Sequence, residues 1–116
     1  MKRNDEMVVV FGYHNLGIIG IKSLIEKNLK IGLVITHKDN PKENTWFSSV
    51  ADFCEINNIE YMFYEDSTFK NISSIILNLK PTLILSVYFR KIIPNEILCI
   101  PTNGSVNLHG SLLPKY

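Results

Sequence analysis

The sequence has 116 residues, of which 46% are hydrophobic and 20% are charged. This length suits a single domain, and this apolar content excludes a disordered or fibrous chain. The 12 Lys and Arg side chains and the 11 Asp and Glu side chains leave a net charge of +1, so we expect no nucleic-acid partner, which would need concentrated basic charge.

The N-terminus and the cysteines exclude further classes of protein. Residues 1–6 mix both signs of charge and do not resemble a signal peptide, and no stretch reaches the ~18 apolar residues of a membrane span. We therefore expect a cytoplasmic protein without a membrane partner. Cys54 and Cys99 form neither a disulfide framework nor a metal motif, and we interpret them as two buried thiols in a reducing compartment, with no metal bound.

The first half of the chain predicts a strand, a helix, a second strand and a loop. Residues 7–13 are a short apolar run, typical of a strand that is buried on both faces. From Gly17 onward, apolar residues recur at helical spacing: Ile18, Ile21 and Ile25. Residues 31–36 form a second apolar run, and residues 37–44 are expected to be a loop.

The middle of the chain predicts another helix and strand. The helix has Asn44 or Thr45 as its expected cap and an apolar stripe of Phe47, Val50, Ala51 and Cys54. Residues 59–64 then predict a third strand.

The remaining residues continue the alternation. A third helix should begin near Asp66 or Ser67, end before Pro81 and carry an apolar stripe of Phe69, Ile72, Ile76 and Leu79. Residues 82–88 predict a fourth strand, residues 94–98 a short helix and residues 105–109 a fifth strand. Alternating strands and helices predict an α/β, Rossmann-like fold with a mostly parallel twisted sheet and helices on both faces.

Three glycines follow the first strand, but they do not match a nucleotide-binding fingerprint. Gly12, Gly17 and Gly20 are spaced G-x4-G-x2-G, whereas dinucleotide sites use G-x-G-x-x-G. We interpret them as a tight turn and close helix packing. Neither a Walker A sequence nor a G-x-S-x-G elbow occurs.

The fifth strand carries the most informative pattern. Because side chains alternate along a strand, Val106 and Leu108 should face the core, while Asn107 and His109 should point together to the other side. The two polar groups then meet at the carboxyl end of a strand, where open α/β sheets bind ligands. They are either a catalytic pair or two side chains whose hydrogen bonds tie down the following loop.

As a catalytic pair, these side chains suit the transfer of an acyl group to an amine. A neutral imidazole, with an ordinary pKa of about 6.5, can manage the proton that the attacking amine loses. An asparagine amide can donate a hydrogen bond to the oxyanion that forms on the carbonyl oxygen. No side-chain nucleophile is then required.

Residues 107–114 match the active-site stretch Asn-x-His-Gly-Ser-Leu-Leu-Pro of the 10-formyltetrahydrofolate-dependent formyltransferases at every specified position. The chain therefore resembles the N-terminal formyltransferase domain of this family. Within the family it is most similar to the UDP-4-amino-4-deoxy-L-arabinose formyltransferases, through residues 11–17, 36–41, 49–51 and 114–116. Such enzymes formylate a nucleotide-linked amino sugar for lipopolysaccharide or lipid A modification.

The resemblance implies roles for individual residues. Asn107 corresponds to the oxyanion stabiliser and His109 to the acid/base. Lys91, Ile92 and Ile93 correspond to the place where the family holds 10-formyltetrahydrofolate, although Ile92 and Ile93 are equally consistent with simple core packing.

His14, at the end of the first strand, lies near the same rim of the sheet in this interpretation. It would either contact the substrate or cap the following helix from the surface.

The resemblance covers the whole chain but only the first half to two thirds of the family's catalytic domain. Family members continue past Tyr116 with an Arg-Gly-Arg stretch, further strands and an aspartate that raises the pKa of the catalytic histidine. We therefore expect a single partial domain, residues 1–116, whose last strand is followed by a loop and whose activity is impaired by truncation.

Two other functions remain open. One is a methionyl-tRNA formyltransferase, which shares the HGSLLP stretch. Such enzymes resemble one another in carrying a basic loop for the tRNA after the second strand. In this chain that loop is residues 37–44, whose charges nearly cancel. A noncatalytic folate- or nucleotide-binding remnant, or a subunit completed by a second polypeptide, is the alternative of another class.

Overall fold

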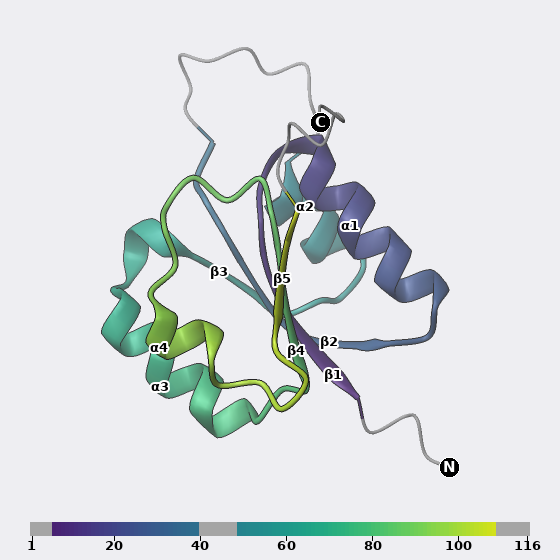
Figure 1. Cartoon of the computed structure of the whole chain (residues 1–116). Coiled ribbons are helices and arrows are strands. Elements are labelled where there is room, and N and C mark those ends of the chain that lie inside the picture. Colours follow the sequence, from purple (N-terminus) through teal and green to yellow (C-terminus); the bar gives the residue numbers. More distant parts are fainter. Residues whose placement is uncertain (1–5, 40–48, 109–116) are drawn as a thin grey trace, which may run out of the picture.

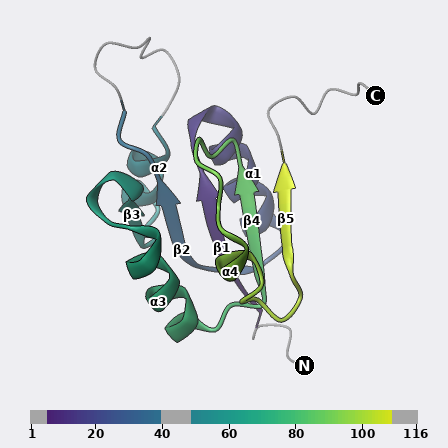
Figure 2. The same ribbon diagram turned by 60° about the vertical axis from the view of Figure 1, so that its left-hand side comes forward.

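The computed structural model describes residues 6–39 and 49–108, which form a five-stranded parallel sheet with helices on both faces (Figure 1). The strand order is β3-β2-β1-β4-β5, so the first strand lies at the centre (Figure 2). The strands are β1 (Met7–Gly12), β2 (Lys30–Thr36), β3 (Tyr61–Phe63), β4 (Leu83–Val87) and β5 (Ser105–Leu108). The predicted Rossmann-like α/β fold is confirmed.

The helices divide between the two faces of the sheet. They are α1 (His14–Glu26), α2 (Val50–Ile56), α3 (Phe69–Leu79) and α4 (Asn95–Leu98), with a 3-10 turn η2 (Tyr64–Asp66) between β3 and α3. Helices α1 and α2 cover one face, and α3 and α4 cover the other (Figure 1). Each face has its own apolar cluster, because successive residues of a strand point to opposite sides.

On the first face, α1 approaches the sheet closely through glycine. A Cβ atom on Gly17 would lie 3.1 Å from the carbonyl carbon of Gly12 and 3.2 Å from a methyl group of Val50. The close approach lets Ile18, Ile21 and Leu24 pack on β1 and β4. The expectation of close helix packing at these glycines is thus supported by the geometry.

The capping residues differ from the predicted ones. Helix α1 already begins at His14, and α2 begins at Val50, where the Ser49 side chain accepts a hydrogen bond from the Asp52 amide at 3.2 Å. Asn44, Thr45 and Phe47 lie outside the described residues. In the same way Thr68, rather than Asp66 or Ser67, caps α3 by accepting from the Asn71 amide. The side chain of a serine or threonine directly before the first turn of a helix accepts a hydrogen bond from a backbone amide that has no partner within the helix, which is why Ser49 and Thr68 are the capping residues.

The end of α3 and the length of β3 also follow from local chemistry. Lys80 adopts a left-handed conformation with φ of 54° directly before Pro81, which ends the helix as predicted. Strand β3 is shorter than the predicted 59–64, because η2 turns the chain away from the sheet after Phe63.

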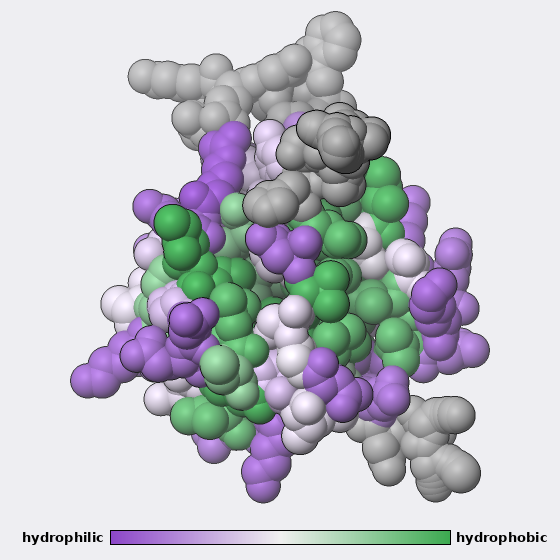
Figure 3. Space-filling view, viewed as in Figure 1, coloured by the Kyte–Doolittle hydropathy of each residue, from purple (hydrophilic) through white to green (hydrophobic). Residues whose placement is uncertain are grey.

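Strand β5 departs from its predicted packing. Val106 and Leu108 pair in register with Leu85 and Val87 of β4, yet they are 47% and 39% exposed. β5 is an edge strand of the described sheet, so it has a neighbouring strand on one side alone. Figure 3 shows apolar surface on the side of the molecule that carries β5. Val106 and Leu108 therefore share the face of Leu85 and Val87, as expected, but the expectation that they are packed in the core is wrong.

The two cysteines also differ from each other. Cys54 is buried between α2 and the sheet, but Cys99 is exposed, so the expectation of two buried thiols holds only for Cys54. None of the helices within residues 6–39 and 49–108 is both long and apolar enough to cross a membrane.

Candidate functional site

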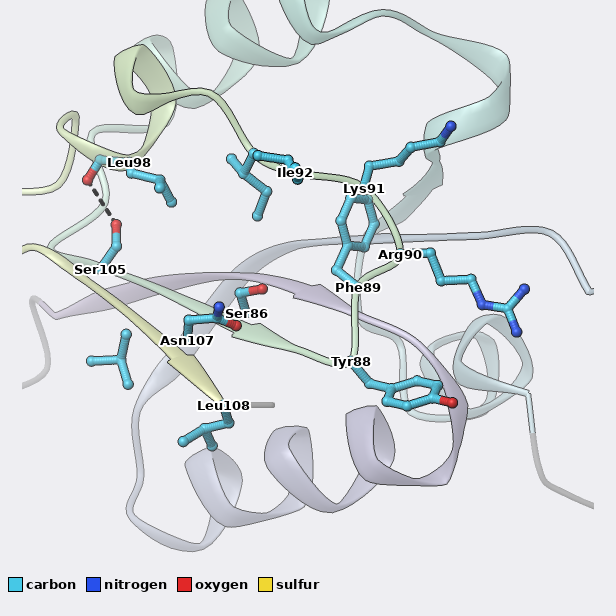
Figure 4. A pocket seen from close by; sticks show the side chains of 12 residues that line it. Ser86, Tyr88, Phe89, Arg90, Lys91, Ile92, Leu98, Ser105, Asn107 and Leu108 are labelled. Atoms are coloured by element: carbon cyan, nitrogen blue, oxygen red, sulfur yellow. Dashed lines mark hydrogen bonds between the residues drawn. The ribbon is translucent and has the colours of Figure 1, made fainter. Parts of the chain in front are cut away.

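A pocket of about 520 Å³ lies where β4 and β5 end, beside the segment of residues 88–93 (Figure 4). This volume falls within the range of about 300–1,000 Å³ that small-molecule sites usually have. Asn107, Lys91, Ile92 and Ile93 all line it. Four of the five residues proposed as site residues from the sequence therefore surround one cavity, and the fifth, His109, lies outside the described residues.

Asn107 reaches the pocket because of its register in the sheet. It pairs with Ser86 of β4, and parallel partners point to the same face, so the two polar side chains lie next to each other (Figure 4). At the start of the strand, the Ser105 hydroxyl donates a hydrogen bond to the Leu98 carbonyl oxygen at 2.7 Å. This bond links β5 to the end of α4, on the same side of the sheet as the pocket.

The two isoleucines of the candidate donor-binding segment have opposite environments. Ile93 is 9% exposed and belongs to the apolar cluster under α3 and α4, whereas Ile92 is 92% exposed. The core interpretation therefore holds for Ile93 and is wrong for Ile92. Lys91 is exposed, with its Nζ atom 5.9 Å from the centre of the Tyr64 ring.

The segment of residues 88–93 turns sharply out of β4. Tyr88 has a φ of 60°, and its amide donates to the Leu108 carbonyl oxygen at 3.4 Å. The Phe89 ring packs edge-on against Phe11, with centroids 5.2 Å apart. These contacts fix the start of the segment to both β5 and the core.

His37 contacts the segment that lines this pocket, and the sequence did not single it out. It directly follows β2 and was expected to lie in a loop, yet it is 5% exposed. Its Nδ1 atom lies 2.8 Å from a carboxylate oxygen of Glu65, and the Arg90 amide donates to its Nε2 atom at 3.1 Å. Its ring also stacks on Phe89, with centroids 4.3 Å apart. A histidine directly after a buried strand is the signal that could have marked it, because the carboxyl ends of parallel strands meet at one edge.

Glu65 is the acidic partner of His37 and comes from η2. Partial burial tends to raise the pKa of its carboxyl, but hydrogen bonds from the Lys38 amide, at 2.9 Å, and from His37 outweigh this effect and lower the pKa. Lys38 itself pairs with Asp66, with 2.7 Å between the charged atoms. The carboxylate of Glu65 is therefore held in its ionised form beside the imidazole.

His14 lies next to this site. It is the first residue of α1, and its ring centroid is 5.0 Å from that of Tyr88, which lines the pocket. The cap position belongs to Tyr13, so the interpretation of His14 as the helix cap is wrong. Whether His14 contacts a substrate stays a prediction.

The arrangement can bind an organic molecule and polarise an oxygen atom on it. Apolar side chains surround the cavity, Lys91 supplies a cation, and the Asn107 amide supplies a hydrogen-bond donor. Within residues 6–39 and 49–108, no group of three or more His, Cys, Asp or Glu side chains is placed to hold a metal ion.

Comparisons with known proteins bear on the family and the fold of this chain. The model of the family described as formyl transferase matches residues 6–116. The fold is similar to that of WlaRD, a sugar 3N-formyltransferase whose crystal structure was determined in the presence of dTDP and 5-N-formyl-THF. The TM-score is 0.56 at 19% sequence identity, and the match covers 83% of this chain and 32% of WlaRD. The chain thus matches about a third of the length of that protein.

Proposed function

Because the chain belongs to the formyl transferase family, we propose that it forms part of an enzyme that moves a formyl group from 10-formyltetrahydrofolate to the amine of a nucleotide-linked amino sugar. The observation that supports this proposal is the pocket that places Asn107 opposite the segment containing Lys91, Ile92 and Ile93. We propose further that the acceptor is of the UDP-4-amino-4-deoxy-L-arabinose type and that the enzyme acts in the cytoplasm.

In the proposed donor site, the residues of the 88–93 segment bind the folate. Ile92 presents an almost fully exposed aliphatic side chain, which gains from being covered by a flat aromatic ring system. Lys91 offers a positive charge to the carboxylates that every folate carries. WlaRD was crystallised with 5-N-formyl-THF, which supports a reduced folate as the ligand class.

The proposed reaction is a direct transfer. The amine nitrogen of the sugar attacks the formyl carbon, the bond from that carbon to N10 of the folate breaks, and the formyl group becomes an amide. The Asn107 NH2 group donates a hydrogen bond to the formyl oxygen as it becomes negative, and His109 takes the amine proton and returns a proton to N10. The residues of this chain therefore stabilise charge and move protons, and no covalent enzyme intermediate forms.

A nucleotide-sugar acceptor is favoured over tRNA. WlaRD is a sugar formyltransferase that was crystallised with dTDP. The sequence between β2 and α2 has a nearly balanced charge, whereas a tRNA acceptor would be attracted by a basic segment.

The first test is binding of 5-formyltetrahydrofolate, a stable analogue, to the purified chain by isothermal titration calorimetry. We expect saturable binding at one site. The test of chemistry measures formyl transfer to UDP-4-amino-4-deoxy-L-arabinose, using a protein that carries these residues together with the rest of the family's catalytic domain. There Asn107→Ala should lower kcat about 10²–10³-fold and leave the folate Kd nearly unchanged.

Asn103→Ala is the matched control for Asn107→Ala. Asn103 is also an exposed asparagine, in the turn before β5, but it does not line the described pocket. Full activity of the control together with full activity of Asn107→Ala would contradict the proposed role. Transfer of the formyl group to methionyl-tRNA instead of the amino sugar would contradict the proposed acceptor class.

A further inference from the structure

His37 connects two segments that are far apart in the sequence. It lies at the end of β2, its Nδ1 atom contacts Glu65 of η2, and its Nε2 atom accepts from the Arg90 amide, 53 positions further along the chain. The ring is buried and lies nearly parallel to Phe89, with an angle of 20° between their planes. Tyr13 and Tyr64 flank it at centroid distances of 5.4 and 5.9 Å.

These contacts determine the protonation state of the imidazole. A backbone amide always carries its hydrogen, so Nε2 of His37 must present a lone pair to Arg90. An ionised carboxylate can only accept, so Nδ1 must carry the proton and donate it to Glu65. The structure therefore requires the neutral tautomer with hydrogen on Nδ1, because a proton on Nε2 would face the Arg90 N–H.

The Arg90 amide belongs to the segment that lines the candidate donor pocket. This segment is attached at Tyr88, Phe89 and Ile93 through β5 and the apolar core. Between these points the Arg90 amide donates its hydrogen bond to His37, directly before Lys91 and Ile92, both of which are exposed and line the pocket.

We infer that His37 is a positioning residue: its Nε2 atom holds the Arg90 amide and thereby sets the conformation of the segment that binds the folate. The inference rests on the proposed function for the identity of the ligand. The role of Glu65 is to keep Nδ1 protonated, which leaves Nε2 free to accept. His37 itself touches neither the reacting atoms nor the donor.

Two substitutions separate the two hydrogen bonds. In His37→Gln the side-chain oxygen can occupy the place of Nε2 and accept from Arg90, while in His37→Asn the shorter amide reaches only the place of Nδ1 and can donate to Glu65. Both variants lose the aromatic stacking on Phe89. Any difference between them in Arg90 exchange or folate affinity therefore reports on which of the two hydrogen bonds is kept rather than on the lost stacking.

The readouts are the Kd of the chain for 5-formyltetrahydrofolate, hydrogen exchange at the Arg90 amide measured by NMR, and urea unfolding. We expect His37→Asn to raise the Kd about tenfold and His37→Gln to raise it less than about threefold. Exchange at Arg90 should become fast in His37→Asn and stay slow in His37→Gln. Ile21→Val, a buried change in α1 on the other face of the sheet, serves as a destabilised control and should leave the Kd unchanged.

Equal folate affinity and equal Arg90 exchange in the Gln and Asn variants would overturn the inference, whether both match the wild type or both are weakened. A wild-type chain that does not bind 5-formyltetrahydrofolate would overturn the proposed function. The exchange measurement would still decide the role of His37 in that case, because it needs no ligand: protection in His37→Gln and none in His37→Asn would support the positioning role.

Discussion

Ile92 offers a direct test of the proposed donor site, because its side chain has almost no role in the fold. Its exposed fraction of 92% means that truncation to alanine removes few contacts, so the free energy of unfolding should change by less than about 0.5 kcal/mol. Fully burying an isoleucine side chain is worth about 1.5–3 kcal/mol. If the folate covers about half of it, Ile92→Ala should lose roughly 1 kcal/mol of binding, which is about a fivefold increase in Kd.

The neighbouring residue provides the comparison for stability. Ile93 is 9% exposed and packs in the cluster under α3 and α4, so Ile93→Ala should lower the free energy of unfolding by about 2–5 kcal/mol. Urea unfolding followed by circular dichroism measures the stability of both variants, and calorimetry with 5-formyltetrahydrofolate measures the affinity.

A result that refutes this reasoning is easy to recognise. If Ile92→Ala binds the folate as tightly as the wild type, the exposed side chain is not part of the donor site. If Ile92→Ala loses more than about 1 kcal/mol of stability, its side chain is not exposed as described.

Three further predictions concern stability and reactivity. Gly17→Ala should lower the free energy of unfolding by about 1–2 kcal/mol, because the steric clash of a Cβ only 3.1 Å from the Gly12 backbone outweighs the ~1 kcal/mol that alanine usually gains in a helix. A variant that is more stable than the wild type in urea unfolding would contradict this. The pKa of Glu65 is lowered in the folded chain, so its contribution to the free energy of unfolding is present above its ordinary pKa of 4.5 and is lost as the pH falls through the lower folded value. The stability of the wild type should therefore fall more steeply in acid than that of Glu65→Gln. Parallel curves of stability against pH would contradict this prediction. Cys99 is exposed, whereas burial raises the pKa of the Cys54 thiol to about 11, so Ellman's reagent should modify Cys99 in the native chain and Cys54 only after unfolding; fast native reaction of both thiols would be inconsistent with the structure.

The strands and helices were largely predictable because most of them have a clear apolar run or an apolar period. Ile72 and Ile76, four residues apart in α3, are both fully buried as predicted. The alternation along β5 correctly grouped Val106 with Leu108, but it could not show whether a second layer covers that face. A sequence period reports which residues share a face, while burial depends on what packs there.

The candidate site was predictable in part for the same reason. Strand register brings Asn107 to the edge where the 88–93 segment lies, and this edge follows from the parallel topology. The buried position of His37 was not predicted, because it depends on contacts with Glu65 and Arg90, which are 28 and 53 positions away in the chain. Local propensity contains no information about such distant partners.

The central place of β1 in the sheet has a consequence for how the chain folds. β1 pairs with β2 on one side and with β4 on the other, and the Met7 amide donates to the Thr82 side chain, 75 positions later. During synthesis, one edge of the apolar β1 strand therefore stays open until residues 83–87 of β4 have been made. Such non-local pairing slows folding and exposes a strand edge to other chains in the meantime. We expect slower synthesis, at reduced temperature, to raise the yield of correctly folded chain.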